Sequence, residues 1–246
     1  MRLPPTDHRP WEVPDSPWVM RQTWSKLLFA HWSLPAEIVR PLIPAPLTLE
    51  TYDGQAWIGV VPFYMSNVRP RYLPAVPWLS FFPEMNVRTY VTYGGKPGIW
   101  FFSLDATQPI AIELARRFFF LPYMNAQMSC KQIAGQVEYR SQRTRKNEYP
   151  AAFHASYRPV GEVYESAPGS LDEWLTERYC LYSIDPQGRL YRGEIHHEKW
   201  KLQAAEAVIH QNTMTTGLGI LLPDTKPILH YVEKMDMVNW LITPVT

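Results

Sequence analysis

The sequence predicts a mainly β protein, a barrel or sandwich of many short antiparallel strands. Strand-like runs outnumber helical ones and follow one another directly, which argues against an alternating strand–helix fold. The 24 prolines are spread along the chain, as expected where they punctuate short strands. The 246 residues are 46% hydrophobic and 14% aromatic, enough for a substantial core. We expect a single domain over residues 1–246, in which 1–20 is a proline-rich extended arm.

The first segments predict strands around one short helix. KLLFAHWSL (26–34) is an apolar run typical of a strand. PAEIVRPLI (35–43) predicts a short helix, because its first proline suits an opening turn and later prolines end it. LTLETYDGQAWIGVVPFYM (47–65) predicts two strands joined at Asp53-Gly54, a dipeptide typical of a hairpin.

FPEMNVRTYV (82–91) alternates polar and apolar side chains. Period two places one set on each face of a strand. The polar set is Glu84, Asn86, Arg88 and Tyr90. If this face meets water, the stretch is an ordinary sheet edge; if it points inward, an acid, an amide, a guanidinium and a phenol share one enclosed space. Gly94-Gly95 predicts a turn into a partner strand at 98–106.

The remaining elements are two helices and further strands. PIAIELARRFFF (109–120) gives the clearest helical pattern, with Pro109 at its start. Its predicted apolar face is Ile110, Ala111, Leu114, Ala115 and Phe118. A capping box at 170–173 predicts a short helix to about Arg178.

Strands are predicted around 125–141 and 151–160, on either side of the charged turn RTRKNE (143–148). YCLYSID and RLYRGEIHHEKWKL predict a hairpin around 186–188. The last segment, 203–246, alternates irregularly.

Composition excludes several classes of function. A net charge of +1, from 24 basic and 23 acidic residues, gives no reason to expect nucleic acid or an anionic membrane as a partner. No apolar run reaches the roughly 18 residues that span a bilayer, and the N-terminus lacks the apolar stretch of a signal peptide. Cys130 and Cys180 lie in no motif, which suggests a reducing compartment. We therefore expect a cytoplasmic protein. No G-x-G-x-x-G motif opens a helix after a strand and no G-x-x-x-x-G-K-S/T motif exists, and we expect no cofactor.

Several motifs carry a resemblance to a known family. HWSLPAEIVRPLIPAPLTL (31–49) and SLDATQPIAIELARRFFFLPYMNA (103–126) resemble segments of acetoacetate decarboxylases and have the same spacing between them. DGQAWIGVVPF, NVRTYV, WFFSLDA, LPY and TERY together resemble the bacterial YqjF-like family, uncharacterised relatives of these enzymes. The resemblance implies a mostly antiparallel, cone-like barrel decorated by short helices and enclosing a deep pocket.

The resemblance also implies which residues line that pocket. Glu84 falls on an active-site glutamate of the decarboxylases, and Tyr123 falls on the lysine that forms their Schiff base. Met124 follows where those enzymes typically carry a second lysine. Because a phenol cannot form an imine, the match argues against Schiff-base decarboxylation. Lys131 shares the strand parity of Tyr123 and is a weak substitute.

Glu84 and Tyr123 are thus the candidate catalytic residues, with four candidate substrate-binding residues beside them. These four are Asn86, Arg88, Tyr90 and His197. We expect Arg88 to lie beside Glu84 and to lower its pKa, which suits a general base or an anion clamp. The alternatives are a solvated strand face, a structural Glu–Arg pair and a core tyrosine.

Other polar residues have mainly structural interpretations. His196 and His197 are successive strand residues and point to opposite faces, so we predict no metal site; His197 is either a pocket base or a satisfied structural histidine. Asp105 is expected to cap or turn the chain before the helix. Arg116 and Arg117 suit the C-terminal end of the 109–120 helix. In Glu177-Arg178-Tyr179 we expect a structural ion pair, and the family resemblance leaves these residues as secondary pocket candidates.

Two functions fit these residues. The first is a cofactor-independent enzyme acting on a small carbonyl or carboxylate compound, with Glu84 as base, Arg88 as anchor and Tyr123 as donor. The second is a binding or sensing module that kept the barrel and lost the chemistry. In both cases the partner is a small-molecule ligand. The sequence leaves open whether the chain forms a homo-oligomer. It also leaves open whether the N-terminal arm covers a barrel mouth or a subunit interface.

Overall fold

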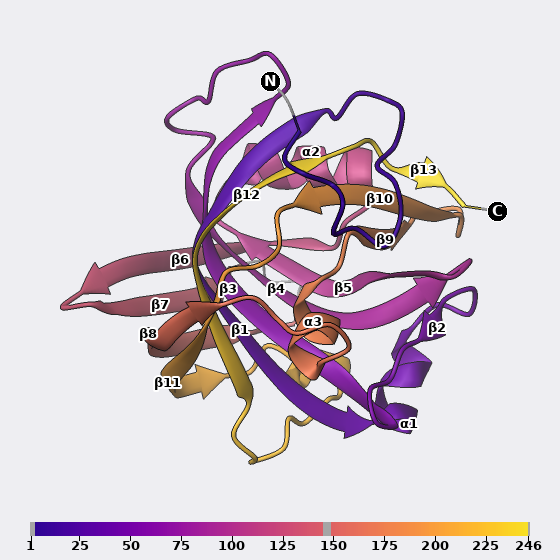
Figure 1. Cartoon of the computed structure of the whole chain (residues 1–246). Helices are drawn as coiled ribbons and strands as arrows, with labels where there is room; N and C mark the ends of the chain where they lie inside the picture. Colours follow the sequence, from indigo (N-terminus) through magenta and orange to yellow (C-terminus); the bar gives the residue numbers. More distant parts are fainter. Residues whose placement is uncertain (1–2, 145–148, 246) are drawn as a thin grey trace.

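The computed structural model describes residues 3–144 and 149–245 (Figure 1). Its strands form one 13-stranded sheet, so the mainly β prediction is confirmed. The strands are β1 Met20–Pro35, β2 Thr48–Leu49, β3 Gln55–Pro70, β4 Phe82–Tyr93, β5 Lys96–Ala106, β6 Tyr123–Ile133, β7 Gln136–Arg143, β8 Ala152–Tyr164, β9 Cys180–Ile184, β10 Leu190–His197, β11 Leu202–Asn212, β12 Ile228–Asn239 and β13 Thr243–Pro244. The helices are α1 Ala36–Val39, α2 Pro109–Phe119 and α3 Leu171–Thr176, with 3₁₀ turns at Arg40–Leu42 and Thr216–Leu218.

The sheet curls back on itself in two places. Its order is β13-β10-β9-β5-β6-β7-β8-β11-β12-β1-β3-β4-β2, and the added pairings β4–β5 and β10–β12 join strands far apart in that order. Neighbours pair antiparallel except where β5 meets β6 and β9. Figure 1 shows the resulting ring-like body, from which the β6–β7 hairpin projects to one side. No helix in the described part of the chain is long and apolar enough to cross a membrane.

Most of the predicted strands and turns are observed. The strands at 82–91 and 98–106 pair as β4 and β5 across Gly94-Gly95, and β9 pairs with β10 as the predicted hairpin. Of the charged turn at 143–148, residues 145–148 lie outside the described part of the chain. Ser170 caps α3 by accepting a hydrogen bond from the Glu173 backbone N–H at 3.2 Å.

The hairpin prediction at Asp53-Gly54 is only half right. The turn forms, with positive φ at both residues and backbone hydrogen bonds between Tyr52 and Gln55. The strand before it, β2, pairs with β4 instead of β3. A dipeptide suited to a turn fixes the local reversal, whereas the pairing partner depends on contacts distant in the sequence.

The β4 strand is covered on both faces, so neither face meets water. Met85 and Val87 pack in a core with residues of β1, β3, β7, β8 and β12. The opposite face carries Glu84 and lies over a second core, to which α2 and Trp200 contribute. The polar side chains of this strand are therefore enclosed, as expected if that face points inward and not toward water.

The apolar face predicted for α2 is wrong in its orientation. The buried residue of the helix is Ile112, whereas Ile110, Leu114 and Phe118 are exposed. The helix is apolar over much of its circumference, so periodicity alone does not fix which side faces the body.

The N-terminal arm packs on its own chain. Arg9 forms an ion pair with Glu194 of β10 at 3.0 Å, and Trp11 Nε1 donates to the same carboxylate at 2.8 Å. Farther along, Trp18 packs against Trp240, whose indole N–H donates to the Ser16 carbonyl. The arm thus covers β10 and the end of β12.

Gly98 allows the close approach of β5 to β9. A Cβ atom there would lie 2.7 Å from Cys180 Sγ and 2.9 Å from the Cys180 carbonyl oxygen. We expect Gly98→Ala to lower the free energy of unfolding by roughly 1–3 kcal/mol, because the backbone contact cannot be relieved by a side-chain movement. Urea titration monitored by tryptophan fluorescence measures the change.

Gly193→Ala on β10 is the matched control for this substitution. Its added Cβ would meet only side-chain atoms of Ile242 and Leu181, at 3.1 and 3.2 Å, so the cost should be smaller. Equal stabilities of Gly98→Ala and the parent chain would contradict this account of the β5–β9 contact.

Candidate functional site

Glu84 and Tyr123 lie side by side. The Tyr123 hydroxyl donates a hydrogen bond to Glu84 Oε2 at 2.9 Å. Glu84 is only 3% exposed, on β4 between Phe63 of β3 and Ala106 of β5. Tyr123 opens β6 and is half-buried, so it is the less buried member of the pair. The two candidate catalytic residues are therefore in direct contact.

Burial dominates the acid–base properties of this pair. It raises the pKa of Glu84 from 4.5 to about 8, opposed by the Tyr123 hydrogen bond and helped by the negative charge of Asp105. Burial also raises the pKa of the Tyr123 hydroxyl well above 10. The expectation that Arg88 lowers the pKa of Glu84 is wrong. At neutral pH the acid keeps its proton and can donate a hydrogen bond.

Arg88 does not pair with Glu84. Its Nη2 donates to the Leu175 carbonyl at 3.1 Å, and its guanidinium lies 5.0 Å from the Phe29 ring centre. Four strand residues span about 13 Å, which separates the two side chains. Among the described residues no carboxylate forms an ion pair with Arg88, and its Nε is buried without a hydrogen-bond partner.

Tyr90, next to Arg88 on the same face of β4, contacts His31. Its hydroxyl contacts the Leu175 carbonyl at 2.8 Å and His31 Nε2 at 2.7 Å. If the single phenolic proton goes to the carbonyl, His31 Nε2 donates to the tyrosine and Nδ1 keeps a lone pair. His31 Nδ1 is buried without a partner among the described residues, as is Asn86 Oδ1. Burial, and then the charge of Arg88, lower the pKa of His31 well below its usual value.

His31 was not selected as a pocket residue from the sequence. It lies on β1 opposite Gly59 of β3, which is in turn opposite Arg88 of β4. An added Cβ at Gly59 would lie 3.1 Å from the His31 ring and 3.3 Å from the Arg88 side chain. The alternation of side chains in 26–34 would place His31 on the same face as Arg88, but only once the strand order β1–β3–β4 is known.

The expected ion pair within Glu177-Arg178-Tyr179 does not form. Arg178 pairs with Glu50 at 2.5 Å and lies 5.0 Å from the Tyr90 ring centre. Glu177 accepts from the Tyr179 hydroxyl and from the Trp200 backbone N–H. Arg178 and Arg88 thus flank the same tyrosine, and only Arg178 has a carboxylate partner among the described residues.

His197 is fully buried between aromatic rings. Tyr179 and Trp200 lie 4.8 and 4.7 Å from it, and its ring nitrogens face the backbone carbonyls of Glu198 and Arg178. Burial lowers the pKa of His197 to about 4. These contacts are those of a structural histidine whose hydrogen bonds are satisfied. A contact between His197 and a ligand stays a prediction.

His196 also has a pKa lowered to about 4, mainly by burial, and stacks on His8 of the arm. In the described ranges, no group of three or more His, Cys, Asp or Glu side chains is arranged to hold a metal ion.

Two arginines support the site in ways the sequence did not indicate. Arg143 forms an ion pair with Asp105 at 2.8 Å, so Asp105 is a buried β5 residue instead of a helix cap. Arg116 turns inward and donates from Nε to the Tyr123 carbonyl at 2.8 Å, instead of only complementing the helix end. Arg117 is exposed, as is Lys131, so that lysine does not replace the missing amine.

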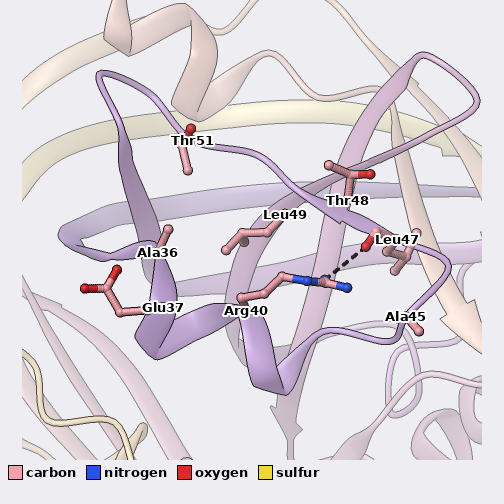
Figure 2. Close-up of a pocket in the computed structure, with 8 residues that line it drawn as sticks. All are labelled: Ala36, Glu37, Arg40, Ala45, Leu47, Thr48, Leu49 and Thr51. Carbon is pink, nitrogen blue, oxygen red and sulfur yellow. Dashed lines mark hydrogen bonds between the residues drawn. The ribbon is translucent and has the colours of Figure 1, made fainter.

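Two surface depressions lie away from this pair. One, of about 420 Å³, lies between α1 and β2, where Arg40 donates to the Leu47 carbonyl (Figure 2). The other lies beside Trp18 and Arg71. Neither is lined by Glu84 or Tyr123, and an open pocket at that pair stays a prediction.

Solved structures with a similar fold include an enduracididine biosynthesis enzyme and an acetoacetate decarboxylase. The enduracididine biosynthesis enzyme MppR complexed with pyruvate matches with a TM-score of 0.64, covering 94% of this chain and 91% of its own. An acetoacetate decarboxylase from Legionella pneumophila matches with a TM-score of 0.62, covering 97% and 92%. Each is 11% identical to this chain, so the likeness shows the fold alone.

Sequence comparison gives the family. The uncharacterised protein YqjF of Bacillus subtilis (strain 168) is 51% identical over 228 residues, 93% of this chain and 93% of YqjF. The DUF2071 family, described as an uncharacterized conserved protein (COG2071), matches residues 21–236. The chain therefore belongs to the DUF2071 family, and its fold is similar to that of an acetoacetate decarboxylase.

Proposed function

We propose that the protein binds a small carboxylate that also carries a carbonyl group, on the face of β4 that holds Glu84 and Arg88. The observation that carries this proposal is the Arg88 guanidinium, which is buried yet has no carboxylate partner among the described residues. A buried charge is costly unless it is paired. A ligand carboxylate supplies the missing partner, and the planar guanidinium suits two-point contact with it.

Glu84 and Tyr123 supply the other end of the site. A neutral carboxyl and a phenol are hydrogen-bond donors at neutral pH, and donors stabilise the negative charge that develops on a carbonyl oxygen during enolisation or hydration. Tyr123 donates to one oxygen of Glu84, which leaves the other free to carry the acid proton. Glu84 thus acts as an acid or donor and not as the base expected from the sequence.

Asn86 lies between the two ends on the same strand face, with its amide oxygen buried and unpaired in the described structure. An oxo-carboxylate offers its carboxylate to Arg88 and, where its chain is long enough to cross the roughly 13 Å between positions 84 and 88, its carbonyl to the Glu84 end. MppR, a neighbour in fold, was solved with pyruvate, a shorter compound of this class. Access from the half-buried Tyr123 side requires side chains above the site to move.

A ligand screen tests the anchor. We expect pyruvate and other small oxo acids to raise the melting temperature by mass action, and acetone, which lacks the carboxylate, to have no effect. Arg88→Met should abolish the shift. Without ligand it should unfold at a higher temperature than the parent chain, because an unpaired buried charge is replaced by an apolar side chain of similar length, a gain of roughly 1–4 kcal/mol.

Arg158→Met is the control for the screen, since Arg158 lies in an exposed ion pair with Glu206. It should leave the ligand shift unchanged. A shift that persists in Arg88→Met would show that Arg88 is not the anchor.

The raised pKa of Glu84 predicts a specific pH dependence of stability. Between pH 4.5 and about 8 the folded chain holds a proton on Glu84 that the unfolded chain has lost. Stability from this group is therefore complete below pH 4.5 and falls by about 1.4 kcal/mol per pH unit up to pH 8. Glu84→Gln stays neutral, so its stability relative to the parent chain should rise across that window.

Urea titrations from pH 4 to 9 measure this difference. Glu162→Gln, at an exposed position of β8, should follow the parent chain at every pH. Tyr123→Phe should move the upper end of the window to higher pH, because the hydrogen bond that lowers the pKa of Glu84 is lost. Parallel curves for the parent chain and Glu84→Gln would mean that Glu84 is ionised in the folded state.

Borohydride treatment in the presence of acetoacetate tests the inference drawn from Tyr123. Reduction traps an imine only where an amine lies within reach of the bound carbonyl. We expect intact-mass spectrometry to show no adduct on the parent chain. A single stoichiometric adduct would place an amine in the site and overturn the assignment of Tyr123 to the lysine position.

A further inference from the structure

The outer face of α2 is apolar and exposed. Ile110, Leu114 and Phe118 follow at intervals of four residues and are 51%, 49% and 55% exposed. The Gln108 side chain, at the start of the helix, donates to the Trp78 carbonyl, which places the 66% exposed Trp78 beside the first turn. We define the α2 face as this helix stripe together with the exposed loop tryptophan beside its first turn.

Contacts on the opposite side fix this orientation. Ile112 is buried in the core that also holds Phe82 and Phe63, and Ala111 packs at its edge. Arg116 is held by the Tyr123 carbonyl. The helix therefore cannot rotate to bury Ile110, Leu114 and Phe118 without leaving these contacts.

The α2 face has the size of a functional apolar patch. With about half of each large apolar side chain exposed, on the order of 100 Å² apiece, its four members present about 400 Å². This lies within the range of the largest apolar patch on a typical monomer and is about half of what each partner buries in a standard interface. The surrounding helix and loop residues would supply the remaining area.

The charges beside the stripe are self-complementary. Glu113 and Arg117 are exposed on one flank of α2, one turn apart. When two copies of the helix pack antiparallel around a two-fold axis near Ala115, the same flanks meet, and Glu113 of each copy faces Arg117 of the other. We infer that the α2 face is a two-fold interface with a second copy of this chain.

Sedimentation equilibrium of the purified full chain tests the interface. We expect a monomer–dimer equilibrium that Ile110→Glu weakens at least tenfold. An acid in the first turn favours the helix itself, so this substitution should not unfold α2. Ile133→Glu is the matched control, because Ile133 is 57% exposed at the end of the projecting β6–β7 hairpin, and it should dimerise like the parent chain.

A charge-reversal cycle tests the two-fold arrangement. Glu113→Arg alone places like charges opposite one another and should weaken the dimer, whereas the double variant Glu113→Arg with Arg117→Glu restores the pairing and the dimer. Thermal melting of each variant verifies that the chain is folded.

A monomer at all concentrations would overturn the inference. A dimer unaffected by Ile110→Glu, or a double variant no better than the single one, would do so as well. Binding of a monomeric chain to vesicles of phosphatidylcholine and phosphatidylglycerol, lost in Ile110→Glu, would instead assign the α2 face to a lipid surface.

Discussion

The constraint on which the site depends is the burial of the Glu84 carboxyl on a strand covered on both faces. A charged carboxylate in such surroundings is costly, so the acid stays neutral and a phenol becomes a better partner than a cation. Arg88, about 13 Å farther along the strand, lies instead among aromatic rings and a backbone carbonyl, where its charge has no carboxylate partner in the described structure.

The strand therefore carries two chemically different ends on one face. Near Tyr123 the groups are neutral donors, whereas near Tyr90 two guanidinium groups lie around one ring and only Arg178 has a carboxylate, from Glu50. The separation of about 13 Å between positions 84 and 88 prevents the two ends from neutralising each other.

Sequence patterns predicted what depends on neighbours along the chain. Alternation in 82–91 placed Glu84 and Arg88 on one face, and Gly94-Gly95 located the β4–β5 turn. The patterns could not predict which distant groups approach each side chain. Arg143, in a charged turn typical of a surface, is nearly buried against Asp105, and the pairing of β2 with β4 is independent of the turn at Asp53-Gly54. The family resemblance, and not a local pattern, predicted that Glu84 of β4 and Tyr123 of β6 lie together.

The orientation of α2 connects the site to the outer surface. A helix that is apolar over much of its circumference could pack on several sides. The hydrogen bond from the Arg116 guanidinium to the Tyr123 carbonyl fixes which side faces the body. That contact holds the start of β6, and with it the phenol that faces Glu84. The same rotation turns Ile110, Leu114 and Phe118 away from the body. A helix that steadies the Tyr123 backbone must therefore expose its apolar stripe, so the placement of the phenol and the α2 face have one structural cause.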